Sequence, residues 1–332
     1  MNNTTYAELP TTNNRAEWLE QRQGGIGSSD ASAIAGLSSF ESPYSLWEIK
    51  TGRAPLDPPV DRTTQRLREW GNRLEPVILE ATADELGIPI TKPETGFYNL
   101  ETPWLRANLD GITADGRICE FKTVHGSQAQ KWDGQIADHA EIQVHHAGLV
   151  TGITHAVVAA LIGGNDFRVY EIELNPRIQE MLLDMEQKFW QHVLDGTRPD
   201  VDGHARTLEA LTREWANRPG SKEVPPEQIQ DLHAEWLEAI EREKQAKQDV
   251  NQLKAQFTSL MDGHETLSSD QRIWAKVRRG RVNTTRLERE HPNIAKEVTR
   301  LEPTIDTQAL KAKHPDIYKQ MQSVSVQPVK EH

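Results

Sequence analysis

The stretch that decides the fold is ANLDGITADGRICEFKTV, residues 107–124. Apolar and polar residues alternate on both sides of a turn signal at residues 114–116, which predicts two short strands joined as a hairpin. Three charged residues, Asp110, Glu120 and Lys122, lie within these strands. Burying a carboxylate or an ammonium group is costly unless it is paired or bound to a metal. The hairpin therefore needs a specific reason to carry these charges.

The length of the hairpin loop decides how the charges are arranged. With a two-residue turn, Asp110 lies opposite Phe121. With a three-residue loop that ends in a left-handed Gly116, Asp110 lies opposite Glu120. Lys122 then follows on the same face, because side chains alternate between the two faces of a strand. We favour the three-residue loop because it gathers the charged groups on one face and separates them from the apolar face.

Opposed carboxylates in such a hairpin suggest a metal site. Directly opposed residues have Cβ atoms about 5 Å apart, and two carboxylates at that distance repel unless a cation lies between them. Oxygen ligands favour Mg²⁺ or Mn²⁺ over zinc. A neighbouring lysine can orient or deprotonate a water molecule, or stabilise charge on a phosphate. The set suits metal-assisted phosphodiester hydrolysis, although the same spacing also occurs by chance in exposed hairpins.

The charge of the chain is unevenly distributed. The 332 residues carry a formal net charge of −12. Residues 1–200 contain 17 Lys and Arg against 29 Asp and Glu, whereas residues 201–332 contain 21 of each. This balance argues weakly against a general nucleic-acid-binding protein. A local basic run at residues 272–281 fits a protein that contacts phosphate at a few places.

Cysteine content and hydropathy exclude several classes of protein. Cys119 is the only cysteine, which excludes an intramolecular disulfide and a zinc site built on several thiolates. The longest apolar stretch, residues 155–164, is too short to span a bilayer. The first residues lack the basic start and apolar run of a secretory signal. We therefore expect a cytoplasmic protein with no membrane partner.

Composition and periodicity divide the chain into four parts. We expect a flexible tail at 1–14, an α/β domain with a mixed sheet flanked by helices at 15–202, a linker at 203–224 and a mostly helical extension at 225–332. Within the α/β domain, Pro76 predicts a break or a kink between two helical pieces.

The extension contains two recognisable patterns. Apolar residues at 229, 232, 236 and 240, and again at 250, 253, 257 and 260, predict a long amphipathic helix or a helix pair that packs on a partner or on its own chain. Residues 282–298 and 305–321 then match at an offset of 23. Each copy reads as a threonine N-cap (Thr284, Thr307), a short helix and a His-Pro start of another turn, so we interpret the repeat as a small structural module.

Several segments of the chain resemble one family in sequence and in order. They are GGIGSSDASAIAGLSSFESPYSLWEIKTG, WGNRLEPVILEATADELG, LRANLDGI, CEFKTV and AEIQVHHAGLVTG. Together they resemble the YqaJ-like viral recombinases, which are phage-type alkaline exonucleases similar to lambda exonuclease within the PD-(D/E)XK nuclease superfamily. The resemblance covers roughly residues 15–200 and implies a core like that of restriction endonucleases.

The resemblance also implies an activity. Such enzymes are metal-dependent deoxyribonucleases that digest one strand of duplex DNA from the 5′ end, releasing 5′-phosphomonoesters and leaving a 3′ overhang for a single-strand annealing protein. It implies Mg²⁺ or Mn²⁺ with two ions per site, a ring-shaped trimer or tetramer, and the cytoplasm of a bacterial host of a phage or prophage. The alternatives are an endonuclease or nicking enzyme of the same superfamily, and a non-catalytic recombination adaptor.

Site residues follow from the resemblance position by position. The implied catalytic residues are Asp110, Glu120, Lys122 and Gln143. The implied metal ligands are Asp110, Glu120, Glu75 and the backbone carbonyl of Phe121. The glutamine motif of the family continues to a tyrosine, but Ala147 occupies that position here, so no ring contact to DNA is expected from it.

A second group of residues is implied to contact DNA. Arg22, Ser28 and Ser29 match the segment that holds the terminal 5′-phosphate in relatives. A glycine-rich turn that opens a helix presents free N–H groups to an anion, and arginine can bind phosphate oxygens in a bidentate manner. Asn108 stands where some relatives have a phosphate-binding serine. Trp132 follows the catalytic strand and is expected either to stack on a base or to anchor its own loop.

Overall fold

The computed structural model describes residues 5–57, 60–215, 220–280, 282–299 and 305–322. The chain divides into two compact units, Met1–Arg213 and Glu214–His332, and each is described by itself. The elements of the first unit are β1 (Tyr6–Glu8), α1 (Arg15–Gln23), α2 (Ser28–Ile34), α3 (Pro43–Lys50), α4 (Arg62–Leu86), β2 (Ile90–Thr91), β3 (Phe97–Asn99), β4 (Arg106–Ala107), β5 (Gly111–Thr113), β6 (Ile118–Val124), the 3₁₀-helix η1 (Gly126–Trp132), α5 (Asp138–Thr151), β7 (His155–Ile162), β8 (Asp166–Glu173), α6 (Pro176–Asp195) and α7 (Ala205–Trp215).

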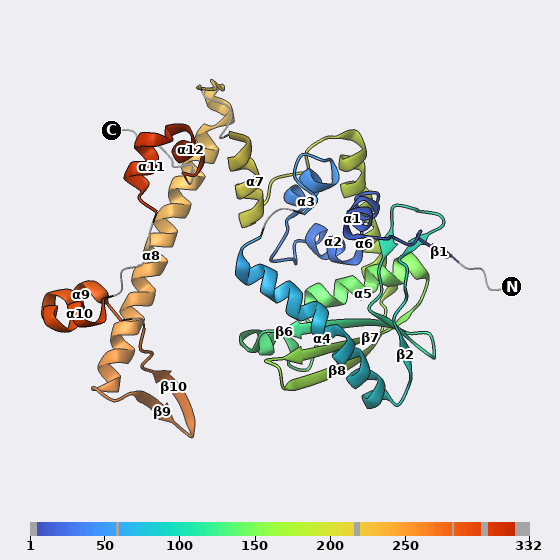
Figure 1. Ribbon diagram of the computed structural model, residues 1–332, viewed down its shortest axis with the longest axis horizontal. Helices are drawn as coiled ribbons and strands as arrows, with labels where there is room; N and C mark the ends of the chain where they lie inside the picture. Colours follow the sequence, from blue (N-terminus) through green and yellow to red (C-terminus); the bar gives the residue numbers. More distant parts are fainter. Residues whose placement is uncertain (1–4, 58–59, 216–219, 281, 300–304, 323–332) are drawn as a thin grey trace. The chain divides into compact units, whose positions relative to one another are not determined.

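The second unit consists of one long helix followed by a hairpin and two helix pairs (Figure 1). Its elements are η2 (Pro226–Gln228), α8 (Gln230–Met261), β9 (Thr266–Ser269), β10 (Arg272–Lys276), α9 (Thr284–Glu290), α10 (Pro292–Val298), α11 (Thr307–Lys313) and α12 (Pro315–Gln320).

A five-stranded mixed sheet forms the centre of the first unit. The strand order is β2-β5-β6-β7-β8. β6 and β7 pair in parallel, and the other neighbours pair in antiparallel. A parallel pair needs a crossover connection, and α5 provides it between β6 and β7. The predicted fold class, a mixed sheet flanked by helices with a mostly helical C-terminal extension, is confirmed.

The β5–β6 hairpin has the predicted three-residue loop. Ile112 lies opposite Ile118, and the Thr113 N–H donates to the Arg117 carbonyl at 3.0 Å. Gly116 has a φ of +88°, a conformation that L side chains rarely adopt. Continuing this register toward the start of the hairpin sets Asp110 against Glu120.

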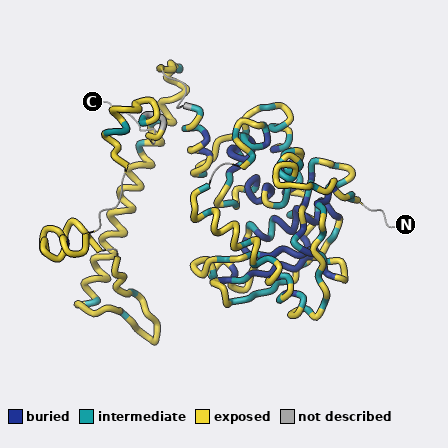
Figure 2. The backbone as a smooth tube through the Cα atoms, viewed as in Figure 1, coloured by how far each residue is buried: buried dark blue, intermediate teal, exposed yellow. Residues whose placement is uncertain are grey.

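Two helices, α4 and α5, cover the two faces of the sheet (Figure 1), and much of the chain in this part of the unit is buried (Figure 2). On one face, α4 packs its Ile78 against Cys119 and Phe121 of β6. On the other face, α5 packs against Ile118, and its Val144 is fully buried. Because side chains alternate along a strand, Glu120 and Lys122 share the α5 face with Ile118.

A second hydrophobic core joins the N-terminal helices to the end of the first unit. Ile26, Trp47 and Phe189 are buried in this core. Ile26 also forms a parallel bridge with Leu105, just before β4. At Gly25 a Cβ atom would lie 2.5 Å from the Trp104 carbonyl oxygen, so only glycine fits at that close approach. The N-terminal segment is thereby held against the residues that lead to Asp110.

Two sequence predictions about the first unit differ from the structure. α4 runs without a break through Pro76, because its Ile78 and Thr82 are buried against the sheet and tertiary packing overrides local propensity. The predicted linker 203–224 begins with α7, whose Thr207 and Ala210 are buried. This amphipathic helix belongs to the second core of the first unit rather than to a linker.

The internal repeat forms two similar helix pairs, α9–α10 and α11–α12. The helix that follows each His-Pro step begins at the proline, as predicted. The backbone angles match closely, with φ and ψ of −137° and 63° at His291 and −139° and 63° at His314. The predicted threonine N-caps are wrong by one position. Asn283 and Asp306 are the caps, because their side chains accept from the free N–H groups of the first turn. Within the described residues, no helix is long and apolar enough to span a membrane.

Candidate active site

Asp110 is held at the start of β5 by a backbone contact from the neighbouring strand. Its Oδ2 accepts a hydrogen bond of 2.8 Å from the Phe121 N–H of β6. This bond fixes the carboxylate on the side of the hairpin that carries Glu120. The sequence predicted a role for the Phe121 carbonyl, whereas the contact that the structure shows comes from its N–H.

The two opposed carboxylates make the site electrostatically strained. Burial and the negative charge of Glu120 raise the pKa of Asp110 to about 8, although the Phe121 N–H and Lys122 act to lower it. Glu120 itself is 9% exposed. Neighbouring carboxylates that are shielded from water are stabilised by a positively charged partner. The pair is therefore a candidate site for a cation.

Lys122 joins the carboxylates to helix α5. Its Nζ donates to Glu120 Oε1 at 2.5 Å and to Gln143 Oε1 at 2.6 Å. Burial lowers the pKa of Lys122, but the charges of Glu120 and Asp110 outweigh that effect and the net shift is upward. The side chain is therefore a protonated ammonium group near neutral pH, and it acts as a donor.

Gln143 occupies the position on α5 that the sequence predicted. It is 7% exposed, and while its Oε1 accepts from Lys122, its Nε2 lies 3.4 Å from Ser32 Oγ of α2. The structure therefore brings Asp110, Glu120, Lys122 and Gln143 into one site built from β5, β6 and α5.

Glu75 lies beside this site without joining it. It forms an ion pair with Lys92, and its charge adds only the smallest of the contributions to the raised pKa of Asp110. In the part of the chain that the structure describes, no three His, Cys, Asp or Glu side chains converge as a metal-binding group. The structure thus brings Asp110 and Glu120 together and leaves Glu75 with a different partner.

The donor set fits a hard divalent cation. Two carboxylates that face each other in a partly dry site supply oxygen ligands, which Mg²⁺ and Mn²⁺ prefer. Burial and Glu120 raise the pKa of Asp110, because a second negative charge is unfavourable at this place. A cation between the two carboxylates would remove this unfavourable energy. A single ammonium donor on the same face suits a reaction in which negative charge develops near the carboxylates.

Ser28 and Ser29 open α2, and Arg22, in the last turn of α1, reaches this helix start with its side chain. Arg22 donates to Ser29 Oγ and to Asp30 Oδ1, both at 2.9 Å. The Oγ of Ser28 is buried and has no hydrogen-bond partner among the described residues. A buried hydroxyl without a partner is uncommon in folded proteins, and it leaves a donor available beside Arg22.

An ion pair that the sequence analysis missed supports this segment. Lys50 of α3 lies 2.7 Å from Asp30, and both side chains are at least 93% buried. Burial opposes ionisation of Asp30, but Lys50 and then Arg22 outweigh it and lower its pKa to about 2. Lys50 also donates to the carbonyls of Arg22 and Gly25. Neither helix sequence, SSDASAI for α2 or PYSLWEIK for α3, indicates that Asp30 and Lys50 pair.

Two of the predicted DNA contacts are placed differently. Trp132 is 1% exposed and packs edge-on against His139, while its carbonyl accepts from Arg168 and Tyr170. The prediction that it stacks on a base is therefore wrong, and it anchors its own segment. Asn108 is exposed, and its Oδ1 lies beside Gly96 rather than at the Arg22 cluster.

A buried histidine fixes α5 behind the site. His146 and Glu186 of α6 are both fully buried, with Nδ1 and Oε1 2.7 Å apart. The other ring nitrogen lies 2.9 Å from the Arg106 carbonyl. Both ring nitrogens face oxygen atoms that can accept a hydrogen bond, which favours a ring that donates from both nitrogens. Burial lowers the pKa of His146, but Glu186 outweighs it and the net shift is upward.

Comparison with known proteins adds a family to this geometry. A sequence profile of the YqaJ-like viral recombinase domain matches residues 17–154. The protein YqaJ of Bacillus subtilis (strain 168), described as uncharacterized, is 30% identical over 294 residues, which cover 86% of this chain and 90% of that protein.

Solved structures show a weaker likeness. The alkaline exonuclease LHK-Exo from Laribacter hongkongensis has a TM-score of 0.47 and 16% identity over 60% of this chain and 98% of that chain. Its complex with dAMP has a TM-score of 0.46 and 14% identity over the same shares of the two chains. The long match to YqaJ, which extends well beyond the profile match, shows that the chain belongs to the family of proteins with a YqaJ-like viral recombinase domain.

Proposed function

We propose that this protein is a metal-dependent 5′→3′ exonuclease for double-stranded DNA that leaves 3′ overhangs for an annealing protein during recombination. The observation that carries the proposal is the geometry of Lys122, which donates to Glu120 and to Gln143 on the face of the sheet that also carries Asp110. The membership of the chain in a viral recombinase family supports the role in recombination.

Asp110 and Glu120 are the residues that would hold Mg²⁺ or Mn²⁺. When bound, such an ion lowers the pKa of water and stabilises charge on phosphate oxygens. The protein supplies the rest. Phe121 orients Asp110 through its N–H, Gln143 holds the ammonium group of Lys122 in place, and Lys122 stabilises the negative charge that develops on the phosphate as a bond to phosphorus forms.

Arg22, Ser28 and Ser29 are proposed to bind the terminal 5′-phosphate. Arg22 is already positioned by Asp30 and Ser29, and Ser28 offers a hydroxyl without another partner among the described residues. An arginine with flanking hydroxyls recognises phosphate oxygens through charge-assisted hydrogen bonds. We expect a duplex with a 5′-phosphate to be digested faster than one with a 5′-hydroxyl.

The expected assembly is a ring of three or four copies around DNA.

The proposal is tested by digesting linear duplex DNA labelled at either the 5′ or the 3′ end, with Mg²⁺ and with EDTA. Early release of the 5′ label, with closed circular DNA left intact, is the expected result. Lys122→Ala should reduce the rate by about 100-fold or more, whereas Lys188→Ala, an exposed lysine of α6, should not change it. Cutting of closed circles, or full activity of Lys122→Ala, would contradict the proposal.

A further inference from the structure

Helix α8 carries an exposed stripe that is apolar toward both ends of the helix and contains two alanines and Glu243 in its middle. Every residue of this 32-residue helix whose burial is described is exposed or only partly buried. Leu253 is 54% exposed, Phe257 41% and Leu260 68%. An exposed stripe of this length on one helix is typical of a surface that another chain covers.

The stripe follows a strict seven-residue repeat. Its positions, which we call the seam of α8, are Ile229, Leu232, Trp236, Ala239, Glu243, Ala246, Val250, Leu253, Phe257 and Leu260. The steps between them alternate between three and four residues, which is the pattern of the contact positions of a coiled coil. It continues for more than four heptads, enough to specify a coiled coil. A face with this period is matched by another helix with the same period.

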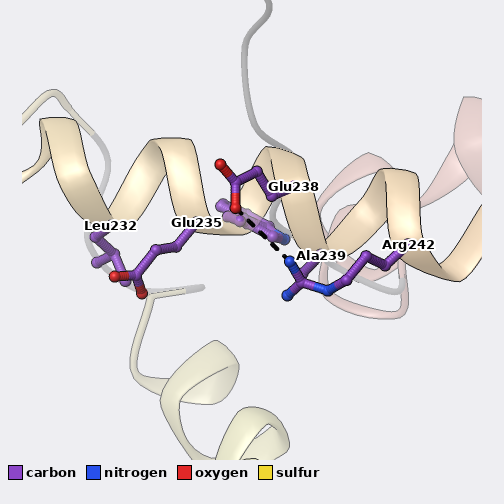
Figure 3. Close-up of a pocket in the computed structure, with 6 residues that line it drawn as sticks. Leu232, Glu235, Glu238, Ala239 and Arg242 are labelled. Carbon is purple, nitrogen blue, oxygen red and sulfur yellow. Dashed lines mark ion pairs between the residues drawn. The ribbon is translucent and has the colours of Figure 1, made fainter.

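Figure 3 shows the first part of the seam. Leu232 and Ala239 lie on the wall of a shallow hollow along the helix, together with Glu235 and Arg242. Arg242 forms an ion pair of 3.7 Å with Glu238 of the same helix, and both side chains are more than 70% exposed. Such exposed pairs contribute little energy, so Arg242 is available to a carboxylate of another chain.

We propose that α8 forms an antiparallel coiled coil with the α8 of a second copy of this chain, a two-copy contact that is separate from the contacts that would close the ring proposed above. In the antiparallel register that aligns the two seams end to end, the large Trp236 faces Leu253 and Val250 faces the small Ala239 of the second copy. Glu243, the one charged residue of the seam, faces Ala246. Alanines therefore face Val250 and Glu243 in the middle layers, and large residues face each other toward the two ends of the coil.

Charge complementarity selects the antiparallel direction over the parallel one. Antiparallel helices bring Arg242 beside Asp249 of the second copy, and symmetry makes this ion pair twice. Parallel helices would instead set the two Glu243 carboxylates against each other in the seam. They would also place Arg242 beside Lys247 of the second copy, a repulsion that a pair between Asp249 and Lys254 would offset, so the Glu243 pair decides against the parallel coil. Like charges in the core of an interface are strongly unfavourable, so the second copy binds in the opposite direction.

Engineered cysteines in the full chain test the direction. Ala239→Cys and Val250→Cys, made singly and together, can be oxidised and examined on a non-reducing gel, since the native Cys119 is fully buried. Within one helix these positions lie about 16 Å apart, too far for a disulfide. The antiparallel coil predicts a covalent dimer from the double variant, or from a mixture of the two single variants, but not from either single variant alone. Covalent dimers from each single variant would show a parallel coil and overturn the proposal.

The molar mass of the full chain in solution tests whether the seam associates at all. Leu253→Lys places a charge in two layers of each dimer and should raise the dissociation constant of the dimer about 100-fold or more. Gln248→Lys adds the same charge to the outer face of α8 and is the matched control. Circular dichroism checks that both variants keep their helical content. A mass that is equal for wild type and Leu253→Lys, with no covalent dimer from the cysteine variants, would refute the proposal.

Discussion

Replacing Asp30 with asparagine should destabilise the first unit by about 3–5 kcal/mol, because it leaves the buried ammonium of Lys50 without a negative partner. A lower bound comes from the Asp30 pKa, which falls from 3.8 to about 2 in the folded chain. At about 1.4 kcal/mol per pKa unit, this shift corresponds to about 2 kcal/mol. The mutational cost is larger because the neutral asparagine side chain also leaves a desolvated charge behind.

The sign of the pH effect follows from the direction of the shift. A carboxyl group whose folded pKa is lowered contributes stability above its unfolded pKa, and that stability is lost as the pH falls toward the folded value. The difference between wild type and Asp30→Asn should therefore be complete at neutral pH and should shrink between about pH 4 and pH 2, which is the window set by the two pKa values.

Urea unfolding of the full chain at pH 7, followed by tryptophan fluorescence, measures this difference. Asp57→Asn is the matched control, because Asp57 pairs with Arg15 while both side chains are largely exposed, and its cost should stay below about 1 kcal/mol. Removing both charges, with Asp30→Asn and Lys50→Met, should cost less than Asp30→Asn alone. A loss of less than about 1 kcal/mol for Asp30→Asn would refute the reasoning.

Three further predictions concern the active site and the core behind it. Asp110→Asn should raise the melting temperature in EDTA at pH 8.5, because burial and Glu120 disfavour the carboxylate of Asp110. The same change should remove the increase in melting temperature that added Mg²⁺ causes, and an unchanged Mg²⁺ effect would contradict this. Trp132→Ala should cost about 3–5 kcal/mol of stability and should change the DNA affinity of the folded molecules little, because the ring is buried. Binding assays on Lys122→Ala chains, which are expected not to cleave the DNA, compare the affinity with and without this change. A clear loss of affinity would contradict the prediction. The pair of His146 and Glu186 should stabilise the fold fully below about pH 6.5 and less as the pH rises through the raised pKa of His146. The free energy of unfolding of wild type and of Glu186→Gln, measured between pH 6 and 9, tests this. A difference between the two proteins that stays constant over this range would refute it.

The hairpin and its charges could be derived from the sequence because their information is local. Gly116 is suited to the left-handed position of a three-residue loop. The two-residue period of strands then predicts which side chains share a face. The placement of Asp110, Glu120 and Lys122 on one face needed no other knowledge of the fold, whereas their catalytic roles were implied by the resemblance to the recombinase family. The role of Gln143 followed from the resemblance to the recombinase family.

The contacts that escaped prediction depend on partners far away in the chain. Asp30 and Lys50 lie on different helices, and nothing in either segment states which charge neutralises which. Pro76 was expected to interrupt α4 because local propensity disfavours it, yet the burial of neighbouring residues against the sheet keeps the helix intact. Trp132 could equally have faced solvent or the core, since a single aromatic residue in a loop has no periodicity to orient it.

The bridge between Ile26 and Leu105 has a consequence for the order of events during synthesis. Ile26 leaves the ribosome long before Leu105, the residue with which it pairs. His146 likewise leaves it before its partner Glu186, which follows 40 residues later. Contacts between such distant segments form slowly, because the intervening loop must close first. A nascent chain therefore fixes α5 behind the candidate site only after α6 has emerged, so the site around Asp110 is completed when nearly the whole first unit has been translated.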